Sequence, residues 1–231
     1  MPLNPSIQKI IPTTQPGVIA SYDFIDVTSG TGVVIFYAGT TGADAGSGFV
    51  SGGILATNAF YSQNVMTTGQ VAGQHNDFTL RHDVDFDVKF LLPQNIEGTA
   101  IVNIPLGSQT NNDAGTAAGV VRALVRKWTG SAEINIASAS GAILNKTAGA
   151  GNYAYDMDCI PLTIPLTHFG AGDTLRLTIE HYYRQSDSSS DLDWFFGHDP
   201  KGRATSSGED NTFGTEPSIL TFQVPFKLNL G

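Results

Sequence analysis

The chain is 231 residues long, and its 12 Lys and Arg residues are outnumbered by 21 Asp and Glu residues, which gives a formal net charge of −9. Proteins that bind nucleic acid gather basic side chains on one surface, so this charge argues against a nucleic-acid partner. The single cysteine excludes an intrachain disulfide and a cysteine-based metal site, and no stretch approaches the 18 apolar residues of a membrane-spanning helix.

The first 17 residues contain four prolines and one charged side chain, Lys9. Proline fixes φ and removes a backbone donor, so residues 1–17 are predicted to form an extended arm rather than a helix or a central strand. We expect its large aliphatic side chains to lie against the same domain or a neighbouring subunit: Leu3, Ile7, Ile10 and Ile11. A frayed terminus is the alternative. Residues 18–231 are predicted to form a single domain.

Ten short strands are predicted from alternating apolar and polar residues and from the turn signals between them. They cover 18–27, 32–37, 53–61, 78–92, 99–106, 118–129, 132–137, 153–165, 173–184 and 218–230. The longest alternation runs from Phe78 to Phe90, where every even position except His82 is apolar. A helix within 111–127 is an alternative that glycines and β-branched residues disfavour. The predicted fold is all-β, an antiparallel, jelly-roll-like β-sandwich with an extended N-terminal arm.

The C-terminal strand repeats the alternation of apolar and polar side chains. Its large side chains are expected to fill the sandwich and to form contacts between subunits at a three-fold axis: Phe222, Val224, Phe226 and Leu228. A second candidate contact region runs from Val27 to Asn76, where Asp44 is the only fully charged residue. Because the cores of interfaces are depleted in charge, this region is predicted to supply contact surface. A Gly-rich loop packed on its own domain is the alternative.

Residues 185–217 are predicted to form a long loop with a rigid aromatic centre, Trp194-Phe195-Phe196, between mobile flanks. The spacing of Asp187, Asp191 and Asp193 loosely suggests oxygen ligands for Ca²⁺. A complete EF-hand sequence is absent, however, and a solvated Ser/Asp loop is the favoured interpretation.

No arrangement of residues in the sequence specifies a reaction. The five histidines form no metal-ligand motif, and His82 and His181 lie in apolar strand patterns typical of satisfied core histidines. Cys159 is expected to be a small buried residue. Asp83, Asp85 and Asp87 alternate along one strand, which predicts an exposed acidic face rather than a catalytic pair. We therefore predict no catalytic residue, no cofactor and no metal.

One local sequence is familiar. The segment from His168 to Leu177, with its Gly172-Asp173 turn, resembles an element that precedes the penultimate strand in jelly-roll trimers of the tumour-necrosis-factor and C1q-like kind. The Pro-rich arm, the low charge and the segments 17–24, 196–200 and 225–228 resemble virion structural proteins of aquatic tailed phages.

The resemblance implies a non-enzymatic virion protein that cements or decorates a phage capsid, made in the host cytoplasm. The implied partners are copies of the chain itself, as a trimer, and the major capsid protein. A carbohydrate-binding, lectin-like host-recognition module is the alternative, with Trp194, Phe195 and Phe196 as exposed aromatic groups. An enzyme whose site is assembled from dispersed residues is a third interpretation.

Overall fold

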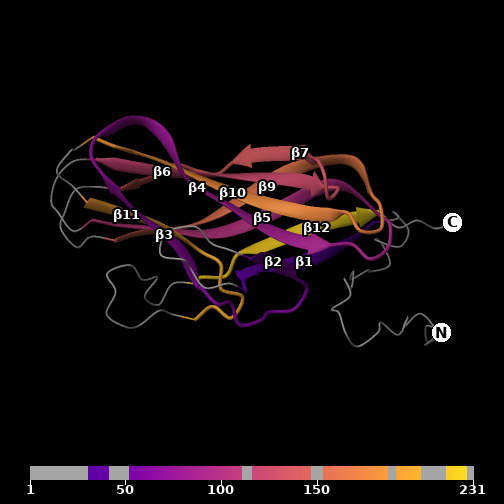
Figure 1. Ribbon diagram of the computed structural model, residues 1–231. Helices are drawn as coiled ribbons and strands as arrows, with labels where there is room; N and C mark the ends of the chain where they lie inside the picture. The colour runs from indigo at the N-terminus through magenta and orange to yellow at the C-terminus, as the bar shows by residue number, and fades with distance from the viewer. Residues whose placement is uncertain are drawn as a thin grey trace.

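The regular structure of the described residues consists of twelve β-strands and no helix, which confirms the all-β prediction (Figure 1). The computed structural model describes residues 31–41, 52–110, 116–146, 153–186, 191–203 and 217–227. The strands are β1 Thr31–Thr40, β2 Gly53–Ala56, β3 Met66–Ala72, β4 His75–Lys89, β5 Gln94–Thr110, β6 Ala117–Trp128, β7 Glu133–Ser140, β8 Leu144–Lys146, β9 Tyr153–Phe169, β10 Thr174–Gln185, β11 Asp191–Gly197 and β12 Thr221–Lys227. The described residues form no helix that could span a membrane.

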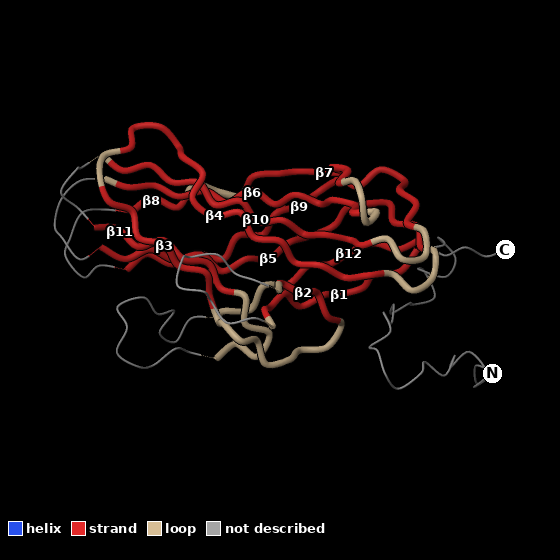
Figure 2. Tube along the Cα trace, viewed as in Figure 1, coloured by secondary structure: helices blue, strands red, loops and turns tan. Residues whose placement is uncertain are grey.

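The strands form two layers that face each other in a sandwich (Figures 1 and 2). One layer, the β12 sheet, contains β9, β5, β12 and β1, and the far half of β5 continues through β11 to β3. The other layer, the β10 sheet, contains β4, β10, β6 and β7, with β8 beside β6. The short strand β2 joins the layers because it pairs antiparallel with β1 and parallel with β4.

The core lies between the two sheets and is built by alternation, since every second side chain of a strand points to the same face. Phe222, Val224 and Phe226 of β12 are almost fully buried, and the rings of Phe222 and Phe226 lie 6.5 and 6.4 Å from the ring of Phe36. These side chains fill the sandwich, as expected, and their burial leaves them unavailable to a neighbouring subunit. Leu228 and the whole arm lie outside the described residues.

The predicted alternation along β4 is interrupted by a β-bulge. His181 of β10 lies opposite His82, whereas the next residue, Tyr182, lies opposite Leu80, so Arg81 is the extra residue. A bulge shifts the alternation by one position. His82 therefore points into the interior, but Leu80 lies on the outer face with an exposed fraction of 45%. The prediction of one continuous buried face along this strand is corrected at that point.

The structure also corrects the predicted loop 185–217. Residues Asp191–Gly197 form β11, which pairs with β3 on one side and β5 on the other. Strands β3 and β8 were not predicted from the sequence either. The alternative of a helix within 111–127 is wrong for residues 117–127, which belong to β6. The β-branched residues of this segment favour a strand.

Candidate functional site

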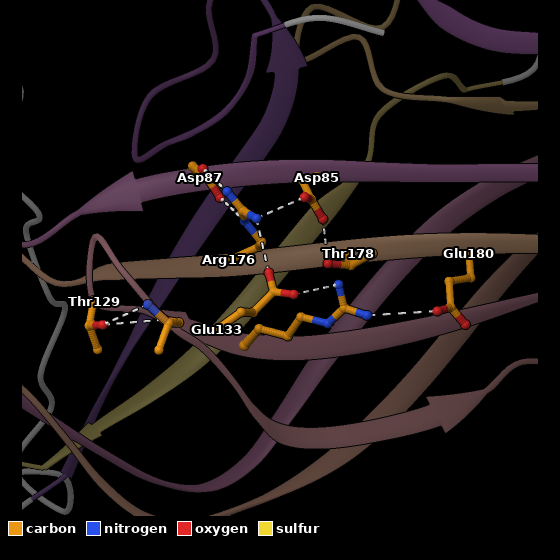
Figure 3. A network of polar contacts seen from close by, with 9 residues as sticks. Asp85, Asp87, Thr129, Glu133, Arg176, Thr178 and Glu180 are labelled. Carbon is orange, nitrogen blue, oxygen red and sulfur yellow. Dashed lines mark hydrogen bonds and ion pairs between the residues drawn. The ribbon is translucent and has the colours of Figure 1, made fainter. Parts of the chain in front are cut away.

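The outer face of the β10 sheet carries a charged network centred on Arg176 of β10 (Figure 3). The guanidinium donates to both carboxylate oxygens of Asp87 on β4, from Nε and from Nη2, each at 2.8 Å. Its Nη1 lies 2.9 Å from a carboxylate oxygen of Asp85 on β4 and 2.9 Å from one of Glu133 on β7. One arginine therefore links three strands through three carboxylates.

The strand register brings these charges together. Arg176 lies opposite Asp87 on one side and opposite Arg126 of β6 on the other. Arg126 continues the network, with Nη1 3.2 Å from Glu133 and Nη2 3.7 Å from Glu180. The prediction of a simply acidic face is wrong because arginines of β10 and β6 alternate with the carboxylates of β4 and β7. Within the described part of the chain, these charges are paired with one another.

Replacing Arg176 with methionine should destabilise the protein by about 1–2 kcal/mol, more than the 0.2–1 kcal/mol of a single exposed pair, because three carboxylates lose their shared cation. Urea unfolding at low salt measures the change. Lys227→Met is the matched control, since Glu97, at 3.2 Å, is the one carboxylate among the described residues that pairs with Lys227. Equal losses in the two variants would contradict the network's cooperative role.

Three histidines lie in the interior of the sandwich. His82, His181 and His198 have exposed fractions of 6%, 1% and 0%. The rings of His82 and His181 are stacked, with centroids 5.8 Å apart and planes inclined by 24°. His181 meets the ring of Trp194 edge-on at 5.6 Å, and His198 meets the ring of Phe196 at 5.8 Å.

Few polar groups surround these three imidazoles. Nε2 of His198 lies 3.1 Å from Oγ1 of Thr67. Among the described residues, Nε2 of His82, Nδ1 of His181 and Nδ1 of His198 have no hydrogen-bond partner. Gly69 of β3 gives His82 its space, because a Cβ there would lie 2.4 Å from the imidazole. His82 and His181 are therefore confirmed as core residues, although without the full hydrogen bonding of satisfied core histidines.

Burial determines the charge of these histidines. It lowers the pKa of His82 and of His198 to about 4 and the pKa of His181 to about 3. All three are neutral at pH 7 and sealed from solvent. Because these side chains are buried, their main expected effect is on stability.

A pocket of about 200 Å³ lies at the end of the sandwich where β4 begins and β10 ends. The register explains why distant segments meet there: Gln185 of β10 lies opposite both His75 of β4 and Ala117 of β6, and Ala118 lies opposite Asn145 of β8. The lining consists of His75, Asn76, Thr116, Ala117, Ala118, Asn145, Arg184, Gln185 and Ser186.

The described residues of the pocket lining are mostly polar and include no carboxylate, although acidic residues outnumber basic residues in the chain. Arg184 supplies its positive charge. The Arg184 guanidinium lies 4.9 Å from the centre of the Phe78 ring, which supports it through a cation–π contact. Within the described part of the chain it forms no ion pair. An arginine that pairs with none of the described carboxylates can offer its donors to an anionic ligand.

Hydrogen bonds and a small apolar cluster hold the pocket wall in place. The backbone N–H of Thr116 donates to Oγ of Ser186 at 2.9 Å, and the backbone N–H of Ser186 donates to the Thr116 carbonyl at 3.0 Å. Ala117 of the lining also packs against buried Tyr183 and Trp194. Because the wall rests on paired strands, the position of Arg184 is set by the fold.

The structure places the other candidate residues elsewhere. Trp194, Phe195 and Phe196 are buried, so they do not form the exposed aromatic surface expected of a lectin-like site. Asp187 lies outside the described residues, and the described residues contain no group of three or more side chains suited to a metal ion. Cys159 is exposed, which corrects the expectation of burial, because the odd-numbered residues of β9 point outward near it.

The pocket was not predictable from the sequence because its lining comes from four separated segments, none with a recognisable motif. The nearest available signal was Arg184, which occupies an outward position in the alternation of β10.

No family model and no curated protein matches the chain. Among solved structures, a CocE/NonD family hydrolase from Staphylococcus aureus matches with a TM-score of 0.48 and 11% identity over 86% of this chain and 37% of the hydrolase. An alpha-amino acid ester hydrolase matches with a TM-score of 0.45 and 10% identity over 84% of this chain and 36% of that enzyme. The chain thus spans just over a third of the length of these hydrolases.

Weaker structural neighbours include a virus and a TNF protein. A structure of infectious bursal disease virus, Gx strain, matches with a TM-score of 0.25 and 12% identity over 94% of this chain and 55% of that chain. Eiger TNF from S. frugiperda matches with a TM-score of 0.18 and 10% identity over 78% of this chain and 96% of that protein. The narrower resemblance to phage cement proteins is not confirmed.

These findings correct the expected function. The hydrolase matches do not agree with the description of the chain as a non-enzymatic capsid cement protein, and the prediction that it is not an enzyme is withdrawn. The TM-scores of these hydrolases, of the virus and of the TNF protein are all below 0.5. The function of the chain is therefore inferred from its pocket alone.

Proposed function

We propose that the end pocket binds a small anionic molecule, with Arg184 pairing with its carboxylate or a comparable anionic group. The observation that carries the proposal is that the described lining holds an arginine but no carboxylate, and that this arginine forms no ion pair with a described residue. A planar guanidinium suits a carboxylate because it can donate two parallel hydrogen bonds.

The size and the remaining polar groups of the pocket narrow the ligand class. Its volume of about 200 Å³ lies below the roughly 300–1,000 Å³ of sites for drug-sized ligands, so the ligand is a small metabolite or the end of a longer molecule. Asn76 and Asn145 add amide donors and acceptors at the wall. These groups match hydroxyl or amide substituents beside the anionic group.

Arg184→Met should weaken binding by at least tenfold, because one charge-assisted hydrogen bond contributes about 1.5–3 kcal/mol. Ligand-observed NMR with a panel of small mono- and dicarboxylates measures the affinity, and it also reports any product that forms. Lys89→Met is the control, since Lys89 and His75 of the pocket lie at opposite ends of β4, a strand of 15 residues.

Comparison of the two variants distinguishes binding in the pocket from nonspecific electrostatic attraction. Retained affinity in Lys89→Met with loss in Arg184→Met is the expected result. Equal weakening in both variants, or no binding of any carboxylate by the folded protein, would overturn the proposal. Arg184→Lys should bind with intermediate affinity, because it keeps the charge but lacks the paired donors.

A further inference from the structure

The outer face of the β12 sheet is almost free of charge, in contrast to the charged outer face of the β10 sheet. The outward side chains of β1, β12, β5 and β9 form this surface, the uncharged face. Its members are Val33, Ile35, Tyr37, Thr221, Gln223, Thr99, Ile101, Asn103, Cys159, Pro161 and Thr163. They belong to one face because they alternate with the buried residues of the same strands.

Large apolar groups on this face are open to solvent. Val33 and Ile35 have exposed fractions of 43% and 44%, and neighbouring Met157 of β9 has 43%. On the outward side of these four strands, the described charges are Glu97 and Lys227, which pair with each other at 3.2 Å near one end. The centre of the face therefore offers apolar and neutral polar contacts only.

Residues 27–76, where Asp44 is the only fully charged residue, contribute to the uncharged face through β1, which supplies Val33, Ile35 and Tyr37. Strands β2 and β3, which also belong to this range, lie at different positions in the sandwich. Of the described residues in 27–76, only those in β1 thus belong to the uncharged face. The other residues of this face come from β12, β5 and β9.

The face is large enough for a stable interface. The ladders place 15 residues of β5 against β9 and 7 residues of β1 against β12. With about 3.3 Å per residue and about 4.8 Å between strands, the four strands span roughly 700 Å², and the part of this span around Pro105 and Gly107 is buried. A standard protein interface buries about 800 Å² per partner.

We propose that a second copy of this chain packs on the uncharged face, sheet against sheet, across a two-fold axis. Two copies with a net charge of −9 each repel through their charged surfaces, whereas two copies of this face meet without opposing charges. A two-fold axis brings the same patch of each subunit together, so a neutral surface is self-complementary. Sheets that pack face to face lie about 10 Å apart, and Ile35 of each copy then lies inside the contact.

The test is the absolute mass of the purified full chain by light scattering coupled to size exclusion. A monomer is 24.4 kDa, so the expected wild-type mass is twice that value, also at high salt because no ion pair carries the contact. Ile35→Glu should convert the dimer into a monomer, since a carboxylate would be buried opposite its own copy.

Leu80→Glu is the matched control, because Leu80 has an exposed fraction of 45% but lies on the opposite face. It should remain dimeric. Gln223→Glu on the uncharged face gives a second variant if Ile35→Glu fails to fold, as judged by circular dichroism. A monomeric wild type, a mass of three subunits, or a dimer that survives both substitutions on the uncharged face would overturn the proposal. A monomer that associates only with a different protein would overturn it too.

Discussion

The protein should lose stability steeply as the pH falls from 6.5 toward 4. Three buried histidines have folded-state pKa values of about 4, 3 and 4, compared with 6.5 in an unfolded chain. Well above pH 6.5 both states are neutral and these groups contribute no pH dependence. Below it, the unfolded chain binds protons that the folded protein cannot accept, so acidification favours unfolding.

The size of the effect follows from the number of histidines. Each histidine lowers the free energy of unfolding by about 1.4 kcal/mol per unit of falling pH, in the range where the unfolded state is protonated and the folded state is not. Three such groups give a slope of roughly 4 kcal/mol per unit, against a total stability of about 5–15 kcal/mol for a typical domain. Burial raises the pKa of Asp83 and Asp158. These carboxyls bind protons more readily in the folded state, so they oppose part of the loss.

His181→Phe tests the origin of the slope. His181 packs edge-on against Trp194 and Phe196, and phenylalanine fits an aromatic cluster without a titratable nitrogen. Urea unfolding at pH 7, 6 and 5 should show a pH dependence reduced by about 1 kcal/mol per unit averaged over this range, with the larger part of the reduction between pH 6 and 5. Phe196→Leu is the matched control, because it loosens the same cluster and should lower stability equally at each pH. An unchanged slope in His181→Phe would contradict the role of the buried imidazoles.

The sequence was sufficient to predict the β-sandwich because most strands are buried on one face only. In β10, Leu175, Leu177 and Ile179 alternate with polar residues, and this period of two is visible without a structure. β11 lacks such a period, since Trp194, Phe195 and Phe196 are consecutive and all buried. Periodicity detects one-sided burial, whereas this strand is covered on both faces.

The candidate site was much less predictable than the fold. The pocket depends on Gln185 meeting His75 and Ala117 through two ladders, and strand register is a property of the folded sheet. The same limitation applies to the charged face: the carboxylates of β4 were visible in the sequence, but the pairing of Asp87 with Arg176 from 89 residues away was not. Sequence patterns show which face a residue occupies, and the topology decides which residues it meets.

Gly107→Ala should destabilise the protein by about 3 kcal/mol or more, toward the upper end of the range for overpacking. Gly107 of β5 lies opposite Phe195 of β11. A Cβ at this position would lie 2.0 Å from Cε2 and 2.4 Å from Cζ of the Phe195 ring. The ring has little room to move, because Phe195 is fully buried and packs against Tyr155 with centroids 6.0 Å apart. The methyl group must therefore displace an aromatic ring or separate β5 from β11.

A double-mutant cycle identifies the clash as the cause. Phe195→Leu alone should destabilise the protein because it leaves unfilled space. The double variant with Gly107→Ala should lose less stability than the sum of the two single losses, because the added methyl group occupies the space that the smaller side chain leaves. Gly170→Ala is the control, because its Cβ would meet Oδ2 of Asp173 at 3.4 Å, an ordinary contact, and should change stability by less than about 1 kcal/mol. Strict additivity of the two substitutions, measured by urea unfolding, would show that Gly107 is required for a reason other than the approach of Phe195.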